Sequence, residues 1–261
     1  MRWACLTKGY KVIDKSRFYA ATVGSDFRRI IDSYDIGIEI DNFCQSVLLD
    51  SADEIKKAGE LMTLADRHII HGPFTELFPA AIDPRARRLA FDRLEQAYDV
   101  CRQLGICKMV VHSGYVPFVF FKSWHTDRSV EFWQEFMSDK PEDFHIYIEN
   151  VLEDEPYMMG SLIERIADDR VGLCLDTGHA NAAGTIDIKE WFEVLGSYIG
   201  HIHLHNNNGK ADEHNPPDSG SMDMDKVMEY IDTYCSSDTT ITIEAYDLAA
   251  SFRWLEERGY I

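Results

Sequence analysis

Potential metal ligands stand at or just after the ends of short apolar runs along the whole chain. Five of the ten histidines and four carboxylates take part in this pattern, in a fixed order. The series runs Ile69-Ile70-His71, Val110-Val111-His112, Ile146-Tyr147-Ile148-Glu149, Leu173-Cys174-Leu175-Asp176 with His179, Ile202-His203, Asp212-Glu213-His214 and Ile241-Thr242-Ile243-Glu244. Imidazole and carboxylate groups bind divalent metals such as zinc and manganese. Ligands that end successive strands of a closed barrel converge on one rim, so the pattern indicates a metal-dependent enzyme.

Short apolar runs alternate with helical patterns throughout the sequence, which is typical of βαβ units and a parallel sheet. Eight strands are expected, near residues 2–6, 35–40, 68–71, 107–112, 144–149, 171–175, 199–204 and 240–244. Helices are expected near residues 26–33, 53–66, 84–104, 127–138, 155–167, 187–197, 223–234 and 247–258. The helix at 84–104 has the clearest ends, because Asp83-Pro84 forms an N-cap with proline in the first turn and Gly105 can terminate it. We predict the α/β class, with residues 1–261 forming a single (β/α)8 TIM barrel.

Two expected loops are long and follow ligand-bearing strands. The first, from Ser113 to His125, is aromatic, and the second, from His205 to Asp223, is polar. Because the loops after the strands form the catalytic face of such a barrel, both are expected to be walls of the substrate site. The aromatic loop is suited either to stacking on a sugar or to a contact in a homo-oligomer.

The composition narrows the range of partners and compartments. Lys and Arg number 26 against 45 Asp and Glu, a net charge of −19 that repels nucleic acids and anionic membranes. The six cysteines include no close CxxC pair, which favours reduced thiols over disulfides or a thiolate zinc site. Neither an apolar leader nor a run of membrane-spanning length is present in the sequence, so a cytoplasmic protein is expected.

In order and spacing, the motifs resemble the xylose isomerase-like TIM-barrel superfamily. That superfamily includes sugar isomerases and epimerases, as well as the endonuclease IV type of abasic-site nuclease. The matching segments are His71-Gly72-Pro73, His112-Ser113-Gly114, Ile148-Glu149-Asn150, Asp176-Thr177-Gly178-His179, His201-Ile202-His203-Leu204-His205, Asp212-Glu213-His214 and Glu244. One such motif is weak evidence, whereas the ordered set spans most of the chain and is specific.

The isomerase and epimerase branch implies one divalent cation held by Glu149, Asp176, His203 and Glu244. Three carboxylates and one imidazole suit Zn, Mn, Mg or Co and leave positions open for substrate oxygens. Such a cation would polarise a carbonyl group and stabilise the enediolate that forms on loss of a neighbouring proton. The resemblance further implies that Glu149 and Glu244 flank the substrate as the proton-transfer pair.

The nuclease branch implies a larger ligand set and a different reaction. Its additional positions are filled here by His71, His112, His179, Asp212 and His214. One to three ions are therefore expected, and a cluster of two or three would suit hydrolysis of a phosphoester. The compact chain and its negative charge favour a small substrate over DNA. Our expectation is thus a metal-dependent isomerase or epimerase of a small sugar or sugar phosphate. The alternatives are a multinuclear zinc phosphoesterase and a barrel that binds without turnover.

Four further residues are candidates for contacts with a carbohydrate substrate. Glu39 ends the second expected strand, Phe74 follows His71-Gly72-Pro73, and Lys210 lies in the polar loop, where it could anchor a phosphate. His201, His203 and His205 alternate and face the same side of one strand, with His203 favoured as the ligand. We expect His205 to contact the substrate or support a ligand, and His201 to be structural. No catalytic role is expected for His68, His125 and His145.

Overall fold

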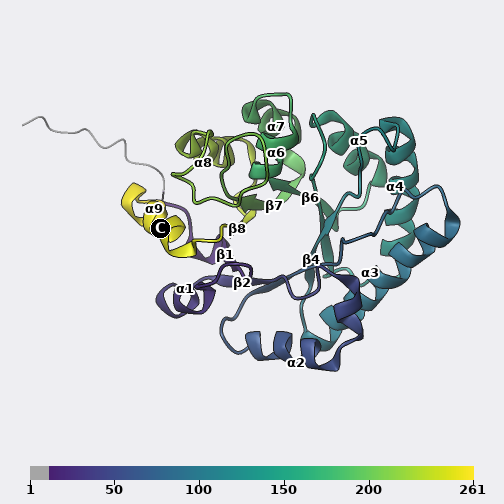
Figure 1. Ribbon diagram of the computed structural model, residues 1–261, viewed down its shortest axis with the longest axis horizontal. Coiled ribbons are helices and arrows are strands. Elements are labelled where there is room, and N and C mark those ends of the chain that lie inside the picture. The colour runs from purple at the N-terminus through teal and green to yellow at the C-terminus, as the bar shows by residue number, and fades with distance from the viewer. Residues whose placement is uncertain (1–11) are drawn as a thin grey trace, which may run out of the picture.

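Eight short parallel strands pair in chain order, and the last pairs with the first, which closes the sheet into a barrel (Figure 1). The computed structural model describes residues 12–261. The strands are β1 (Phe18–Ala21), β2 (Gly37–Ile40), β3 (His68–His71), β4 (Lys108–His112), β5 (His145–Glu149), β6 (Val171–Asp176), β7 (Ile199–Leu204) and β8 (Thr240–Ile243). The predicted (β/α)8 barrel is therefore confirmed.

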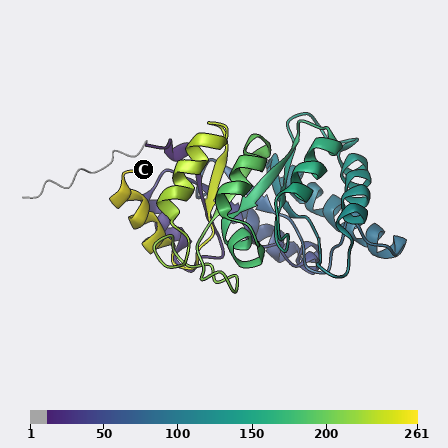
Figure 2. The same cartoon turned by 90° about the horizontal axis from the view of Figure 1, so that it is seen from above.

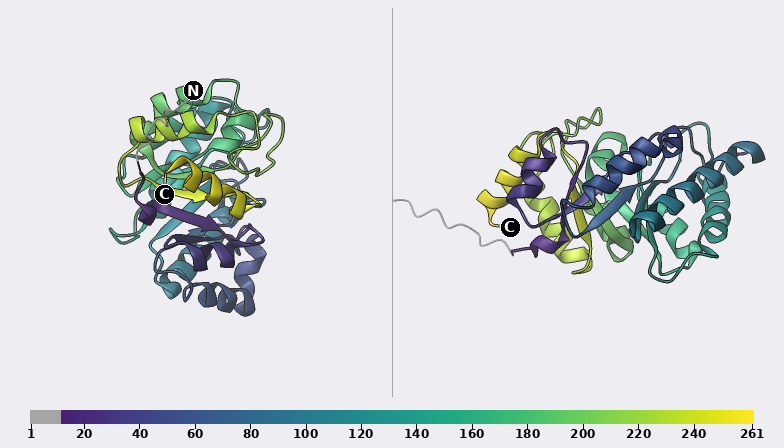
Figure 3. Two further views of the ribbon diagram at one scale, coloured as in Figure 1. Left: turned by 90° about the vertical axis from the view of Figure 1, so that its left-hand side faces the viewer. Right: turned by 90° about the horizontal axis from the view of Figure 1, so that it is seen from below.

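Helices surround the strands on the outside of the barrel (Figure 2). They are α1 (Phe27–Ser33), α2 (Ala52–Leu61), α3 (Pro84–Leu104), α4 (Lys122–Met137), α5 (Tyr157–Ile166), α6 (Thr177–Ala183), α7 (Ile188–Leu195), α8 (Met224–Tyr234) and α9 (Leu248–Arg258). The first and last helices pack side by side across the seam between β1 and β8 (Figure 3). Within residues 12–261, none of these helices has the length and apolar character needed to cross a bilayer.

The helix over 84–104 shows how local sequence sets the ends of an element. Its cap is the side chain of Asp83, which accepts a hydrogen bond from the Arg85 amide at 2.7 Å. Gly105 ends it with φ 72°, a left-handed conformation that costs glycine little. Both ends agree with the prediction from the sequence.

Side chains inside the barrel form layers, and the potential metal ligands belong to the layer at the carboxyl ends of the strands. Beneath that layer a separate buried cluster fills the interior, formed by Tyr19, Ile69, Val110, Tyr147 and Cys174. The two tyrosine rings pack against the backbone of other strands at positions where a side chain would collide with them. A Cβ atom on Gly37 would lie 2.3 Å from the Tyr19 ring, and one on Gly200 would lie 2.3 Å from the Tyr147 ring. Glycine at these strand positions therefore allows large aromatic side chains in the lower part of the barrel.

Three expectations about the elements need correction. The strand expected near 2–6 lies outside the described residues, and the first barrel strand is β1, which the sequence analysis did not select. β1 has only four residues, follows the charged segment 15–17 and ends in no ligand, so it lacked the signal used for the others. The short helix α6 was not expected. The aromatic loop is shorter than predicted, because α4 begins at Lys122.

Candidate metal centre

Four predicted ligands converge at the carboxyl ends of β5 to β8. Glu149 and Asp176 are the last residues of their strands, His203 lies near the end of β7, and Glu244 directly follows β8. One ligand atom from each lies within 4.8 Å of the other three. His203 Nδ1 is 2.9 Å from Glu244 Oε2, 3.5 Å from Glu149 Oε1 and 3.7 Å from Asp176 Oδ2. One imidazole nitrogen thus faces three carboxylate oxygens.

Two atoms of this group show that it fits a divalent cation. His203 Nδ1 and Glu244 Oε2 are buried, yet neither has a hydrogen-bond partner within residues 12–261. Although the two atoms are 2.9 Å apart, their mutual orientation is not that of a hydrogen bond. Buried polar atoms are normally partnered, because leaving them unpaired is costly. A buried nitrogen and a buried oxygen that lie this close without a hydrogen bond could both bind the same cation.

The electrostatics of the site favour positive charge. Five carboxylates gather here, on Glu39, Glu149, Asp176, Asp212 and Glu244. Burial opposes ionisation of Glu149, but the neighbouring charges of His112 and His203 hold its pKa well below the ordinary value. Burial also disfavours a charged His203, and the acidic groups around it nevertheless raise its pKa well above the ordinary value. The site therefore stabilises a cation, either a proton on an imidazole or a metal ion.

A second ligand group shares Glu149 with the first. His71 Nε2 and His112 Nε2 lie 3.2 and 3.3 Å from the same oxygen, Glu149 Oε2, while Oε1 faces His203. The ring of Phe74 stacks on His112 with a centroid separation of 3.9 Å and an angle of 7°. Phe74 is half-buried and forms one wall beside the ligands.

A third ligand group is built around Asp212 in the polar loop. Asp212 Oδ2 lies 2.7 Å from His214 Nε2 and 3.3 Å from His179 Nε2. The ring of His205 stacks on that of His214 at 4.3 Å, and its Nε2 is 3.0 Å from both oxygens of Asp176. All five additional ligands expected from the sequence therefore lie next to the four central ones.

The Asp176-Thr177-Gly178-His179 motif explains how two strands are held in register for this chemistry. The Asp176 carboxylate caps α6 by accepting from the His179 amide at 2.6 Å. The hydroxyl of Thr177 lies 3.1 Å from the carbonyl oxygen of His203. A Cβ atom on Gly178 would lie only 1.9 Å from His205 Cε1, so only glycine leaves room for that ring.

The candidate substrate residues occupy different places. Glu39 is buried beneath the ligands, where it accepts hydrogen bonds from His203 and His201 at 2.9 and 3.0 Å. Phe74 lies at the mouth of the site, whereas Lys210 is exposed in the polar loop. The remaining histidines are elsewhere, with His68 and His145 at the opposite ends of their strands and His125 buried in α4.

The sequence analysis assigned no role to three polar residues at this face. Asn150 clamps the ends of β5 and β6, donating to the Asp176 carbonyl at 3.0 Å and accepting from its amide at 2.9 Å. Glu153 joins two loops by accepting from the Ser113 hydroxyl and the Val151 amide. Burial, together with the charge of Glu39, raises the pKa of Asp41 to about 7. Asp41 and Asn150 directly follow β2 and β5, the same signal that identified the ligands.

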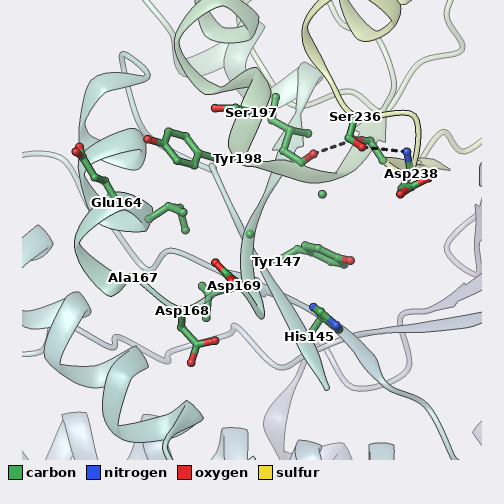
Figure 4. Close-up of a pocket in the computed structure, with 16 residues that line it drawn as sticks. His145, Tyr147, Glu164, Ala167, Asp168, Asp169, Ser197, Tyr198, Ser236 and Asp238 are labelled. Atoms are coloured by element: carbon green, nitrogen blue, oxygen red, sulfur yellow. Dashed lines mark hydrogen bonds between the residues drawn. The ribbon is translucent and has the colours of Figure 1, made fainter. Parts of the chain in front are cut away.

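A cavity lies at the other end of the barrel, and none of the candidate ligands lines it (Figure 4). Its volume is about 560 Å³. It is lined by residues at the amino ends of β5, β6 and β7, including His145, Gly172 and Gly200, together with Tyr147 and Tyr198. In (β/α)8 barrels the chemistry takes place at the carboxyl ends of the strands. This cavity therefore does not compete with the ligand cluster as a candidate active site.

Comparisons with known proteins agree with the resemblance seen in the motifs. The model of the family described as xylose isomerase-like TIM barrel matches residues 32–258. An uncharacterised Methanocaldococcus jannaschii protein, MJ1311, is 32% identical over 186 residues, which cover 65% of this chain and 62% of that protein. A probable endonuclease 4 of Mycobacterium leprae is 25% identical over 171 residues, covering 61% and 66% respectively. The chain thus spans a little under two thirds of the length of these relatives.

Solved structures share the fold over almost the whole chain. A D-tagatose 3-epimerase-like protein superposes with a TM-score of 0.75 and 25% identity, covering 93% of this chain and 96% of that one. A Thermus thermophilus protein soaked with ZnCl2 has a TM-score of 0.73 and 19% identity, covering 94% and 98%. The structural neighbours therefore include epimerase-like barrels and a barrel studied with zinc.

Proposed function

Because this chain belongs to the xylose isomerase-like TIM barrel family, we propose that it is a metal-dependent isomerase or epimerase of a small sugar or sugar phosphate. The observation that carries the proposal is the group of Glu149, Asp176, His203 and Glu244, with its two buried, unpartnered ligand atoms. The cation is Zn, Mn, Mg or Co, all of which accept this mixture of oxygen and nitrogen ligands.

The two glutamates carry the proton transfer in this proposal. When bound, the cation supplies Lewis-acid polarisation of a carbonyl oxygen, which acidifies the adjacent C–H group. One glutamate removes that proton and the other returns a proton, on the opposite face for an epimerase or at the neighbouring carbon for an isomerase. The side chain of Glu244 is 14% exposed and that of Glu149 only 1% exposed, so Glu244 has the more direct access to a substrate.

The remaining side chains of the face are assigned to substrate binding and support. Phe74 offers an apolar surface to a sugar ring, and the exposed Lys210 is a candidate for a phosphate group. His205 is buried against Asp176, so it supports that ligand instead of reaching the substrate directly. Glu39 is likewise buried and accepts a hydrogen bond from His203. The proposed role of Glu39 and His205 is therefore to hold ligand side chains in place.

The test is activity per bound metal in Glu149→Gln and Glu244→Gln. Both variants should lose at least about 100-fold in turnover per bound ion, because each loses a proton-transfer group besides a ligand. Solvent deuterium incorporation into a panel of ketoses and their phosphates provides the assay. Glu153→Gln changes a buried glutamate that contacts none of the four ligands and serves as the matched control. Activity that simply follows metal occupancy would contradict the acid–base assignment.

A second candidate function is hydrolysis of a phosphoester, as in endonuclease IV-like proteins. It is favoured by the two outer groups, in which His71 and His112 share an oxygen of Glu149 and in which His179 and His214 share an oxygen of Asp212. Phosphoester hydrolysis gains from several ions on the attacking and leaving oxygens, whereas enolisation needs only one. Three tightly held zinc ions with phosphodiester cleavage, and no deuterium exchange into any sugar, would establish this alternative over our first proposal.

A further inference from the structure

A buried carboxylate lies directly behind the candidate metal ligand His203. Glu39, on β2, is only 1% exposed, and no Lys or Arg is paired with it among the described residues. Its Oε1 accepts a hydrogen bond from His203 Nε2 at 2.9 Å. Its Oε2 accepts from His201 Nε2 at 3.0 Å and from the hydroxyl of Thr242. All partners of this carboxylate are therefore neighbours on β7 and β8.

We propose that Glu39 and His201 are positioning residues that orient His203 and fix its tautomer for metal binding. A neutral imidazole carries one N–H group, and which nitrogen carries it depends on the hydrogen bond made by the other end of the ring. With Glu39 accepting from Nε2, the lone pair lies on Nδ1, which is the atom facing Glu149, Asp176 and Glu244. The opposite tautomer would place a lone pair against the carboxylate of Glu39.

His201 is fixed on every side, which explains why it contributes to this arrangement. Its Nδ1 lies 2.6 Å from the Thr240 hydroxyl. The ring of Tyr147 stacks on it at 5.8 Å, and Tyr19 meets it edge-on at 6.2 Å. Because His201 and Thr242 occupy Oε2, the other oxygen of Glu39 is left for His203 alone. The carboxylate therefore has one orientation, and through it the ligand ring has one as well.

A carboxylate that accepts a hydrogen bond from a metal-binding imidazole also makes the metal-bound nitrogen more basic. Loss of such a carboxylate generally weakens metal affinity about 10–100-fold. We expect the same for Glu39→Gln, which keeps the size of the side chain and removes its charge. The inference uses the metal site of the proposed function, yet it concerns affinity and not turnover. A failure to act on any sugar would refute the isomerase assignment and leave the affinity comparison intact.

The experiment measures the zinc affinity of the metal-stripped protein by competition with a chromophoric chelator. Glu39→Gln should bind zinc about 10–100-fold more weakly than the wild type, whereas the matched variant Glu153→Gln should stay within about threefold. Thr242→Val, which removes the hydroxyl that donates to Oε2 and lies 2.9 Å from His201 Nε2, should weaken binding in the same direction by a smaller factor. It replaces Glu39→Gln as the main test if that variant does not fold.

Nitrogen-15 NMR of the zinc-loaded protein gives a readout that a general packing defect would not change. The wild type should show a protonated Nε2 and a metal-shifted Nδ1 for His203, with slow exchange of the Nε2 proton. In Glu39→Gln that proton should exchange faster. Zinc affinities of Glu39→Gln and Thr242→Val within threefold of the wild type would overturn the inference. Absence of zinc binding by the wild-type protein would overturn it as well.

Discussion

His125 should make the stability of this barrel depend on pH through a single buried imidazole. It lies in the first turn of α4, fully buried, and its Nε2 donates to the Ser113 carbonyl at 3.1 Å. Its Nδ1 has no partner among residues 12–261, so nothing compensates a second proton. Burial lowers the pKa of His125 from 6.5 to about 4. The folded chain therefore excludes a proton that the unfolded chain binds.

The sign and size of the effect follow from these two pKa values. Below pH 6.5 the unfolded imidazole is protonated while the folded one stays neutral, so the free energy of unfolding falls as the pH falls. The loss ends near pH 4, below which both states are protonated, and its full size is about 3 kcal/mol. Lowering the pH from 7 to 4.5 should reduce the free energy of unfolding by about 2 kcal/mol through this residue. Above pH 7 the residue contributes no pH dependence.

Urea unfolding of the wild type and His125→Gln, followed by circular dichroism in EDTA, tests this reasoning. At pH 7 the variant should be less stable by about 1–2 kcal/mol, because it loses packing and the bond to Ser113. That difference should vanish or reverse by pH 4.5, since glutamine cannot titrate. Chelation keeps acid release of metal out of the comparison. A difference between the two proteins that is the same at both pH values would refute a neutral, buried His125.

Three further outcomes are expected. Zinc at about 100 times its dissociation constant should add about 2.7 kcal/mol to the free energy of unfolding and raise Tm by roughly 5–10 °C over the protein in EDTA, measured by calorimetry; an unchanged Tm would argue against a metal site. Gly178→Ala should weaken zinc binding at least about tenfold, because its methyl group would displace the His205 ring, as chelator competition would show. Phe74→Ala should raise KM severalfold at unchanged zinc content, since it removes the ring beside His112; an unchanged KM would exclude Phe74 as a substrate wall.

The barrel could be predicted because most of the candidate ligands mark the end of a strand. Strand-end residues such as Glu149 and Asp176 gave both the position of an element and its chemistry, and seven of the expected strands correspond to β2–β8. β1 has neither a ligand nor a clear polar alternation, and its place is set by pairing with β2 and β8. Such pairing joins residues far apart in the sequence, so local patterns do not reveal it.

The convergence of the candidate ligands could be predicted from the sequence, but the supporting contacts could not. Glu39 and Phe74 had similar claims to touch a substrate, yet the structure buries one beneath His203 and leaves the other at the mouth. The difference arises because the Glu39 side chain points into the barrel and contacts His201 and His203 of β7. Closure of the sheet creates this contact between strands that are not neighbours in it. Asn150 was part of a recognised motif, but its two bonds to the Asp176 backbone depend on the adjacent strand.

The tyrosine-filled lower layer determines how molecules can reach the centre. The rings of Tyr19 and Tyr147, seated against Gly37 and Gly200, separate the ligand cluster from the cavity at the opposite end. On the proposed function, substrate and product would therefore share the side of the barrel formed by the loops at the carboxyl ends of the strands. Because both would also occupy the same ligand cluster, product inhibition is expected to be competitive with the substrate.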